Sequence, residues 1–75
     1  MAKITAELTI HLNGEPRTFN VDTLTIQGLF DELKLSTSGR IVEHNGSIIS
    51  QSDYSLTLCS GDVVEIIQFM GGGAF

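Results

Sequence analysis

The start of the chain constrains the fold most, because residues 4–12 alternate strictly between apolar and polar side chains. The apolar members are Ile4, Ala6, Leu8, Ile10 and Leu12. A period of two predicts a strand that buries one face, as in an antiparallel sheet. Asn13-Gly14 follows, and because both residues tolerate positive φ, this dipeptide predicts a tight hairpin. The return strand is expected over residues 17–21, with Pro16 at an edge or turn because proline lacks an N–H.

The pattern then changes to that of a helix. Thr23 or Thr25 can cap its first turn through the side-chain hydroxyl. Apolar side chains recur at helical spacing, at Ile26, Leu29, Phe30 and Leu33. These positions form one stripe, which predicts an amphipathic helix with a single buried face.

The second half of the chain reads as short strands separated by turns. A third strand is expected over residues 41–44, and a second Asn-Gly turn leads to a short edge strand at residues 48–49. Residues 51–54 read as a turn or a single helical turn. The last strand, residues 63–69, is the most apolar. This order predicts an α+β domain in which one helix crosses one sheet face, with the first and last strands side by side at the centre.

Composition limits the possible partners. The chain has 75 residues and a net charge of −5, with nine acidic residues against four basic ones. This balance disfavours nucleic-acid binding, which needs clustered lysine and arginine. No run is long enough to span a membrane, no signal-peptide stretch is present, and one cysteine forms no internal disulfide. We therefore expect a cytoplasmic protein of one domain with neither nucleic acid nor membrane as a partner.

Five segments carry a resemblance to a known family. They are Asn13-Gly14-Glu15-Pro16, Leu29-Phe30-x-x-Leu33, Asn45-Gly46-x-Ile48-Ile49, Gly61-Asp62-x-Val64-x-Ile66 and Gly71-Gly72-Gly73. In this order and spacing the chain resembles the ThiS-type sulfur carriers, which are ThiS/MoaD-like members of the ubiquitin-like β-grasp family. The resemblance implies a mixed sheet of four to five strands with one main helix packed across it. It also implies a domain over residues 1–70 and a flexible C-terminal tail over residues 71–75.

The receiving pathway is less constrained. The short chain and the stretch Ile67-Gln68-Phe69-Met70 favour the thiamine type over the small subunit of molybdopterin synthase, whose relatives often carry prolines there. Related carriers also feed cysteine, homocysteine, methionine and siderophore pathways.

The resemblance assigns the chemistry to the tail. Gly73 would carry the reactive carboxylate, adenylated and then converted to a thiocarboxylate. Gly71 and Gly72 would be the access residues, since residues without a Cβ can thread a narrow channel. The chain itself would bind no cofactor and no metal and would not be an enzyme. ATP and magnesium would be used by a ThiF-like activating enzyme, and a ThiG-like thiazole synthase would receive the sulfur.

Ala74 and Phe75 follow the glycines and depart from the thiamine carriers, most of which end at glycine. Some relatives carry a short extension that a JAMM-type zinc protease removes, so the resemblance implies a pro-form. Two other classes use the same features: a ubiquitin-like protein modifier joined through the same glycine, and a β-grasp interaction module with an inert tail.

Several side chains in the body have competing interpretations. If the helix covers Val64, then Ile67 and Phe69 are exposed and, with Met70, form a docking site for the activating enzyme; otherwise these side chains are core. We favour docking because Glu65 shares their face. Cys59 is expected to be a small buried hydrophobe rather than a reactive thiol. His11 and His44 lack metal-ligand spacing and are expected on strand surfaces.

Overall fold

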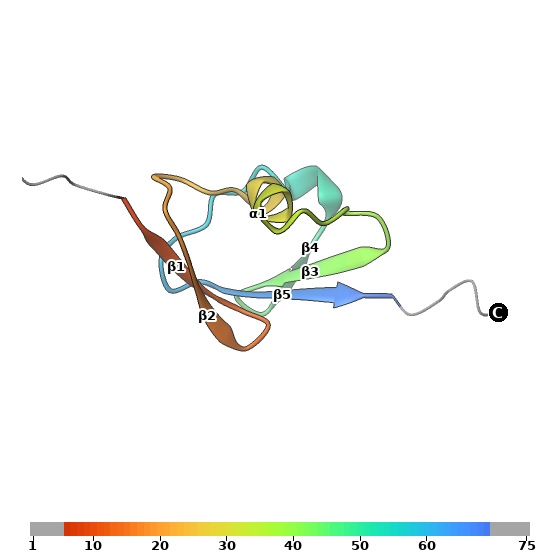
Figure 1. Ribbon diagram of the computed structural model, residues 1–75. Helices are drawn as coiled ribbons and strands as arrows, with labels where there is room; N and C mark the ends of the chain where they lie inside the picture. The colour runs from red at the N-terminus through yellow and green to blue at the C-terminus, as the bar shows by residue number, and fades with distance from the viewer. Residues whose placement is uncertain (1–5, 70–75) are drawn as a thin grey trace, which may run out of the picture.

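The computed structural model describes residues 6–69, which form a sheet of five strands with one α-helix across it (Figure 1). In chain order the elements are β1 (Leu8–Leu12), β2 (Glu15–Phe19), α1 (Ile26–Leu33), β3 (Arg40–His44), β4 (Ser47–Ile49), a 3-10 turn (Gln51–Asp53) and β5 (Val63–Gln68). Within residues 6–69 there is no helix of the length and apolarity needed to cross a membrane.

The sheet is mixed, and β5 lies at its centre. The strand order is β2-β1-β5-β3-β4. β1 and β5 run parallel, with Leu12 paired to Val64, and the other neighbours are antiparallel. The first and last strands are therefore adjacent, as the sequence predicts. The α+β fold class, with a mixed sheet and one main helix, is confirmed.

Both Asn-Gly turns adopt the expected conformation and also bind the central strand. Asn13 and Gly14 have φ of 50° and 87°, and Asn45 and Gly46 have 50° and 89°. Positive φ at both central residues matches the twist of the flanking strands. Beyond this, the Asn13 side-chain oxygen accepts a hydrogen bond from the Ile66 N–H at 2.8 Å. The Asn45 side-chain oxygen accepts one from Val63 N–H at 2.8 Å, so each hairpin is tied to one side of β5.

The ends of α1 are closed by local hydrogen bonds. Of the two candidate caps, Thr25 is the N-cap, and its hydroxyl accepts a hydrogen bond from the Gly28 N–H at 3.0 Å. At the other end Lys34 adopts a left-handed conformation with φ of 58°. The Leu35 N–H then bonds to the Phe30 carbonyl, which is the pattern of a Schellman motif. These bonds satisfy backbone groups that an eight-residue helix otherwise leaves open.

The core lies between α1 and one face of the sheet. The helix contributes Ile26, Leu29 and Phe30, each without solvent exposure. The sheet contributes the equally buried Ile10, Val42 and Val64. Phe30 stacks on Tyr54 with ring centroids 5.7 Å apart, which closes the core beneath the 3-10 turn. The sheet has no second layer among the described residues, so its other face is open (Figure 1).

Some details of the sequence interpretation are wrong. The first strand was expected over residues 4–12, but Ala6 and Glu7 precede β1, which begins at Leu8. The return strand begins at Glu15 rather than residue 17 and ends at Phe19, because the two-residue turn lets pairing start at once. Pro16 lies inside this edge strand, where a missing N–H is tolerated. Cys59 is exposed rather than buried, since Leu58 takes the core position and Cys59 begins the turn that leads into β5.

Candidate functional site

The structure describes the root of the predicted tail. Met70, Gly71, Gly72, Gly73, Ala74 and Phe75 lie outside the described residues. β5 ends at Gln68, and the Phe69 N–H still bonds to the Gly39 carbonyl at 2.9 Å. The position where the body ends is thus set by the central strand and by the loop before β3.

β5 separates its side chains cleanly between the two sheet faces. Val64 is fully buried under α1. Val63, Ile67 and Phe69 point the other way, with 44%, 45% and 57% of their surfaces exposed. The helix therefore covers the Val64 face, and the expectation that Ile67 and Phe69 are exposed is confirmed.

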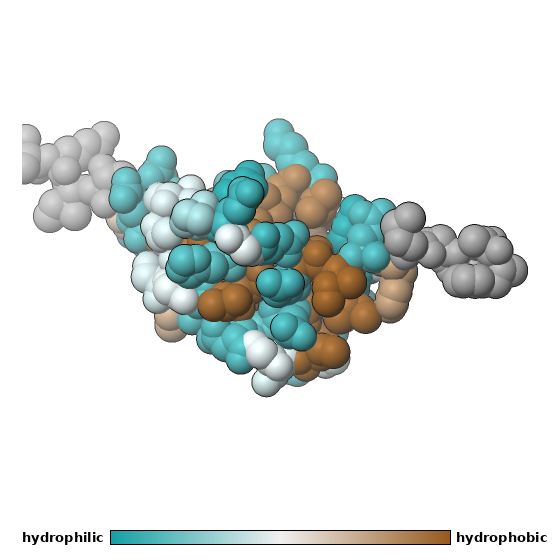
Figure 2. Space-filling view, turned by 90° about the horizontal axis from the view of Figure 1, so that it is seen from below, coloured by the Kyte–Doolittle hydropathy of each residue, from teal (hydrophilic) through white to brown (hydrophobic). Residues whose placement is uncertain are grey.

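Neighbouring strands add to this exposed face through the sheet register. Ile41 of β3 pairs with Ile67 of β5. Ile48, on the edge strand β4, pairs with Glu43 of β3. We call Ile41, Ile48, Val63, Ile67 and Phe69 the open-face patch. Figure 2, which views the molecule from the side opposite α1, shows apolar surface gathered toward the C-terminal end of the sheet with polar surface beside it. Apolar surface that a fold leaves open in this way is typical of a protein-binding site.

Two carboxylates interrupt the open-face patch. Glu43 of β3 lies directly opposite Glu65 of β5, and both are half-buried. The sequence interpretation placed Glu65 on this face but missed Ile41, Ile48 and Glu43. Alternation within residues 40–44 could have placed Ile41 and Glu43 opposite Val42, whereas the position of Ile48 depends on strand pairing.

A hydrogen-bonded cluster closes the other end of β5. His44 Nε2 lies 2.8 Å from Asp62 Oδ2, which also accepts the Cys59 N–H at 2.9 Å. The Asn45 amide donates to the other Asp62 oxygen at 3.2 Å. Partial burial alone would raise the pKa of Asp62, but the bonds from Cys59, His44 and Asn45 and the charge of His44 outweigh it, so the pKa lies below the ordinary value of 3.8. This cluster joins the turn between β3 and β4 to the turn before β5 and is structural.

Histidine, cysteine and carboxylate side chains do not form a metal centre in residues 6–69, where no group of three or more of them gathers. His11 is exposed on β1, as expected. His44 is half-buried and engaged by Asp62, which the sequence interpretation did not foresee because the pairing joins residues 18 positions apart.

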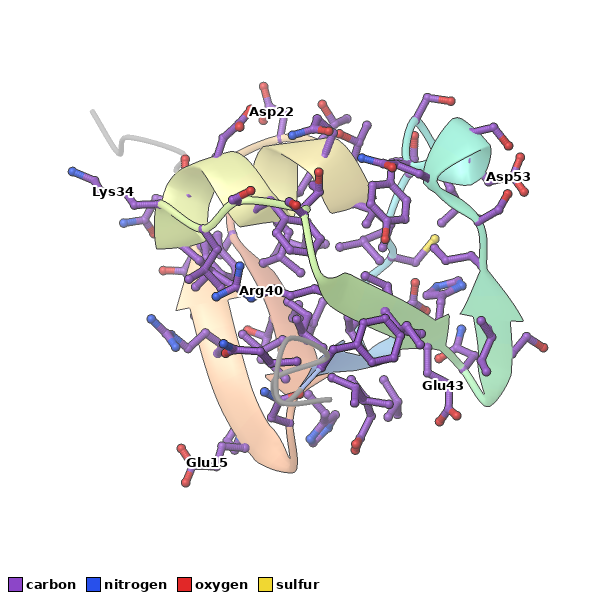
Figure 3. All side chains as sticks on the ribbon, turned by 90° about the vertical axis from the view of Figure 1, so that its right-hand side faces the viewer. Glu15, Asp22, Lys34, Arg40, Glu43 and Asp53 are labelled. Atoms are coloured by element: carbon purple, nitrogen blue, oxygen red, sulfur yellow. The ribbon has the colours of Figure 1, made fainter. Side chains whose placement is uncertain are left out.

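An open pocket of about 300 Å³ lies on the helix side of the sheet. The residues that line it include Leu33, Ile66 and Gln68 and the two arginines, Arg17 and Arg40. Figure 3 shows Arg40 on the same side of the sheet as α1, and its guanidinium donates to the Ser36 carbonyl at 2.7 Å. Both arginines of the chain are therefore on the face opposite the open-face patch.

Comparison with known proteins accounts for nearly the whole chain. The sequence profile of the ThiS family matches residues 10–73. The sulfur carrier protein ThiS of Bacillus subtilis is 42% identical over 65 residues, covering 85% of this chain and 98% of that protein. The crystal structure of the thiamine biosynthesis protein ThiS from Geobacter metallireducens superimposes with a TM-score of 0.76 at 32% identity, over 88% of this chain and all of that one.

Two larger proteins match as well. The thiazole synthases of Magnetococcus marinus and Paramagnetospirillum magneticum are each 36% identical, over 67 and 64 residues. The match covers 88% and 84% of this chain but only 20% and 19% of those proteins. The profile match, the near-complete alignment with a curated carrier and the shared fold agree: this chain belongs to the ThiS family.

Proposed function

We propose that this chain carries sulfur as a thiocarboxylate on Gly73 and donates it to thiazole formation in thiamine biosynthesis. The observation that carries the proposal is the family match, which runs through the glycines to residue 73 and stops before Ala74. The relatives named as sulfur carrier and as thiazole synthase support the same pathway. In this role the chain is a protein co-substrate in the cytoplasm rather than a catalyst.

The chemistry follows from the weakness of a carboxylate as an electrophile. The activating enzyme uses ATP and magnesium to convert the Gly73 carboxylate to an acyl-adenylate, with release of pyrophosphate. A persulfide sulfur then displaces AMP from the carbonyl carbon. This step forms a C–S bond and gives an acyl disulfide that keeps the S–S bond of the persulfide. A thiol then attacks the donor sulfur and cleaves that S–S bond, which leaves the outer sulfur on glycine as a thiocarboxylate and forms a disulfide with the donor. The product is a nucleophile carried covalently by the chain.

The thiazole synthase matches support direct transfer of sulfur. Proteins of that name contain a segment similar to this chain over about a fifth of their length. A carrier and a synthase joined in one chain have a high effective concentration for each other. We propose that a ThiG-like synthase takes sulfur from this carrier.

Gly73 is reactive only when it is the last residue. In any chain that continues into Ala74, its carbonyl belongs to a peptide bond and cannot be adenylated. The benzyl side chain of Phe75 would also not fit an activating-enzyme channel shaped for glycine. We therefore propose that a JAMM-type zinc protease hydrolyses the Gly73–Ala74 bond before activation.

The open-face patch is the surface through which we propose that the activating enzyme binds the body of the chain. Ile67 and Phe69 are exposed beside the root of the tail, and Met70 follows them in the chain. We propose that the ThiF-like activating enzyme covers this surface. Binding through the body supplies free energy that offsets the ordering of residues 71–73 in the enzyme channel.

The decisive experiment is the intact mass of the protein purified from its native cell during active thiamine synthesis. We expect loss of Ala74 and Phe75, and a fraction in which one oxygen is exchanged for sulfur. Gly73→Ala is the matched variant, and it should abolish the sulfur-containing species while the body stays folded. A full-length mass without sulfur would contradict the proposal, and a ladder of conjugates would instead indicate a protein modifier.

A further inference from the structure

We propose that the activating-enzyme surface that covers the open-face patch carries a basic side chain, arginine or lysine, seated over Glu43 and Glu65. The inference rests on the proposed docking of that enzyme and adds the chemistry that the enzyme supplies there. Its apolar side chains would cover Ile41, Ile67 and Phe69, next to this cation.

The register brings the two carboxylates together within an apolar surface. Glu43 and Glu65 are directly opposite across the antiparallel β3–β5 pair, and the next open-face pair toward the tail is Ile41 with Ile67. On the other side of Glu43 lies Ile48, with 68% of its surface exposed. Side chains directly opposite in such a pair have Cβ atoms about 5 Å apart, and like charges there destabilise the sheet.

Within residues 6–69, no basic side chain forms an ion pair with Glu43 or Glu65. Among residues 6–69 the ion pair present is His44 with Asp62, which is elsewhere. Arg17 pairs with the buried Ile10, and Arg40 pairs with Gln68, so both arginines lie on the helix side and line the pocket there. In Figure 3 Glu43 projects away from α1, whereas Arg40 lies on the side of α1.

The other basic side chains of residues 6–69, Lys34 and His11, form no ion pair with either glutamate. Lys34 follows α1 and points away from the molecule in Figure 3. On the open face, β1 presents His11, which pairs with Val63 and not with either glutamate. The described part of the chain therefore keeps its acidic pair on one face and its arginines on the other.

Because the acidic pair and the arginines lie on opposite faces, the open face favours a partner with a positively charged surface. A second copy docked through the same face would place acidic pairs against each other, and an anionic surface would be repelled in the same way. A cation meeting both carboxylates makes charge-assisted hydrogen bonds, and an arginine fork can reach two acceptors. The acidic pair is thus unfavourable in the free chain and favourable in the complex.

The acidic pair is expected to lower the stability of the free chain and to strengthen binding in the complex, so the test measures both quantities. The variants Glu43→Gln, Glu65→Gln and the double variant keep shape and remove charge. Calorimetry would measure binding of the processed chain, which ends at Gly73, to its activating enzyme at low and high salt, and urea unfolding would measure the stability of the free chain. Glu32→Gln, on the exposed face of α1, is the control with the same change in net charge.

We expect each single variant to weaken binding about tenfold at low salt, the value for losing one charge-assisted contact. The double variant should lose most of the salt dependence of binding, and no glutamine variant should be less stable than the parent chain. The control should bind as the parent does. Parent-like binding by the double variant overturns this inference and leaves the proposed function intact, whereas failure of the parent chain to bind overturns both.

Discussion

At the scale of single residues, the two turn asparagines do more than permit a tight turn. Each adopts positive φ, and each places its side-chain oxygen on a backbone N–H of β5. The hairpin on either side of the central strand is thereby fastened to it beyond the regular pairing. An asparagine supplies both properties, whereas glycine supplies the first alone.

Asn45 allows these two contributions to be separated. We expect Asn45→Ala to lower the free energy of unfolding by about 2 kcal/mol, because alanine is strained at φ of 50° and the Val63 N–H loses its acceptor. Asn45→Gly removes the same side-chain hydrogen bonds, to Val63 and Asp62, without the strain and should cost about half as much. Urea unfolding measures both. Equal losses would show that the backbone conformation contributes nothing.

Asp62 makes stability depend on pH in acid. Its pKa lies below 3.8 in the folded chain, so the unfolded chain binds more protons there and stability rises with pH. The contribution is present above 3.8 and is lost as pH falls below that value. We expect Asp62→Asn to be less stable at neutral pH and to lose less stability on acidification, measured by urea unfolding across this range. Asp22→Asn, an exposed carboxylate, is the control; an unchanged acid slope in Asp62→Asn would contradict the assignment.

At the scale of elements, α1 is short and depends on its ends. Eight residues form few internal hydrogen bonds, so the cap at Thr25 and the motif after Leu33 stabilise a large part of it. The position of the helix decides which sheet face is open, because it covers the Val64 face and leaves the opposite face, the proposed docking surface, uncovered.

Thr25 tests the N-cap directly. We expect Thr25→Ala to reduce stability by about 1 kcal/mol, since the Gly28 N–H loses its side-chain acceptor. Thr23→Ala is the matched control, because Thr23 is exposed and Thr25 is the N-cap. Thermal unfolding measures the stability of both variants. A larger loss of stability for Thr23→Ala than for Thr25→Ala would show that Thr23 is the N-cap instead.

At the scale of the whole molecule, the fold has one helix packed on one face of one sheet. Aromatic side chains therefore lie either in the single core or on the open face. Phe30 is fully buried in the single core, whereas Phe69 is 57% exposed. Small domains bury a low fraction of their surface, so the loss of one core aromatic is a large share of total stability.

The two phenylalanines therefore predict opposite behaviour. We expect Phe30→Ala to cost about 3–5 kcal/mol and to unfold much of the population, because it leaves a cavity. Phe69→Ala should change stability by about 0.5 kcal/mol or less and should instead weaken binding to the activating enzyme. Circular dichroism and a binding titration check the pair. Substantial unfolding of Phe69→Ala would show that this side chain belongs to the core.

The site was predictable to different degrees at different positions. The faces of β5 follow from alternation, so Ile67 and Phe69 could be proposed from sequence and their exposure confirmed. The prediction that Cys59 is buried was wrong, because burial there depends on which of two adjacent residues faces the core. Ile48 was missed because its place beside Glu43 is set by pairing between strands.

The sequence by itself determined the elements and the family. Turns, capping and amphipathic periods are local properties, so Asn13-Gly14, Thr25 and the stripe from Ile26 to Leu33 can be read from neighbours alone. The tertiary structure decided which face α1 covers and which charges meet. Strand order brings Glu43 opposite Glu65 and His44 beside Asp62, and these contacts join residues 22 and 18 positions apart, for which local pattern carries no information.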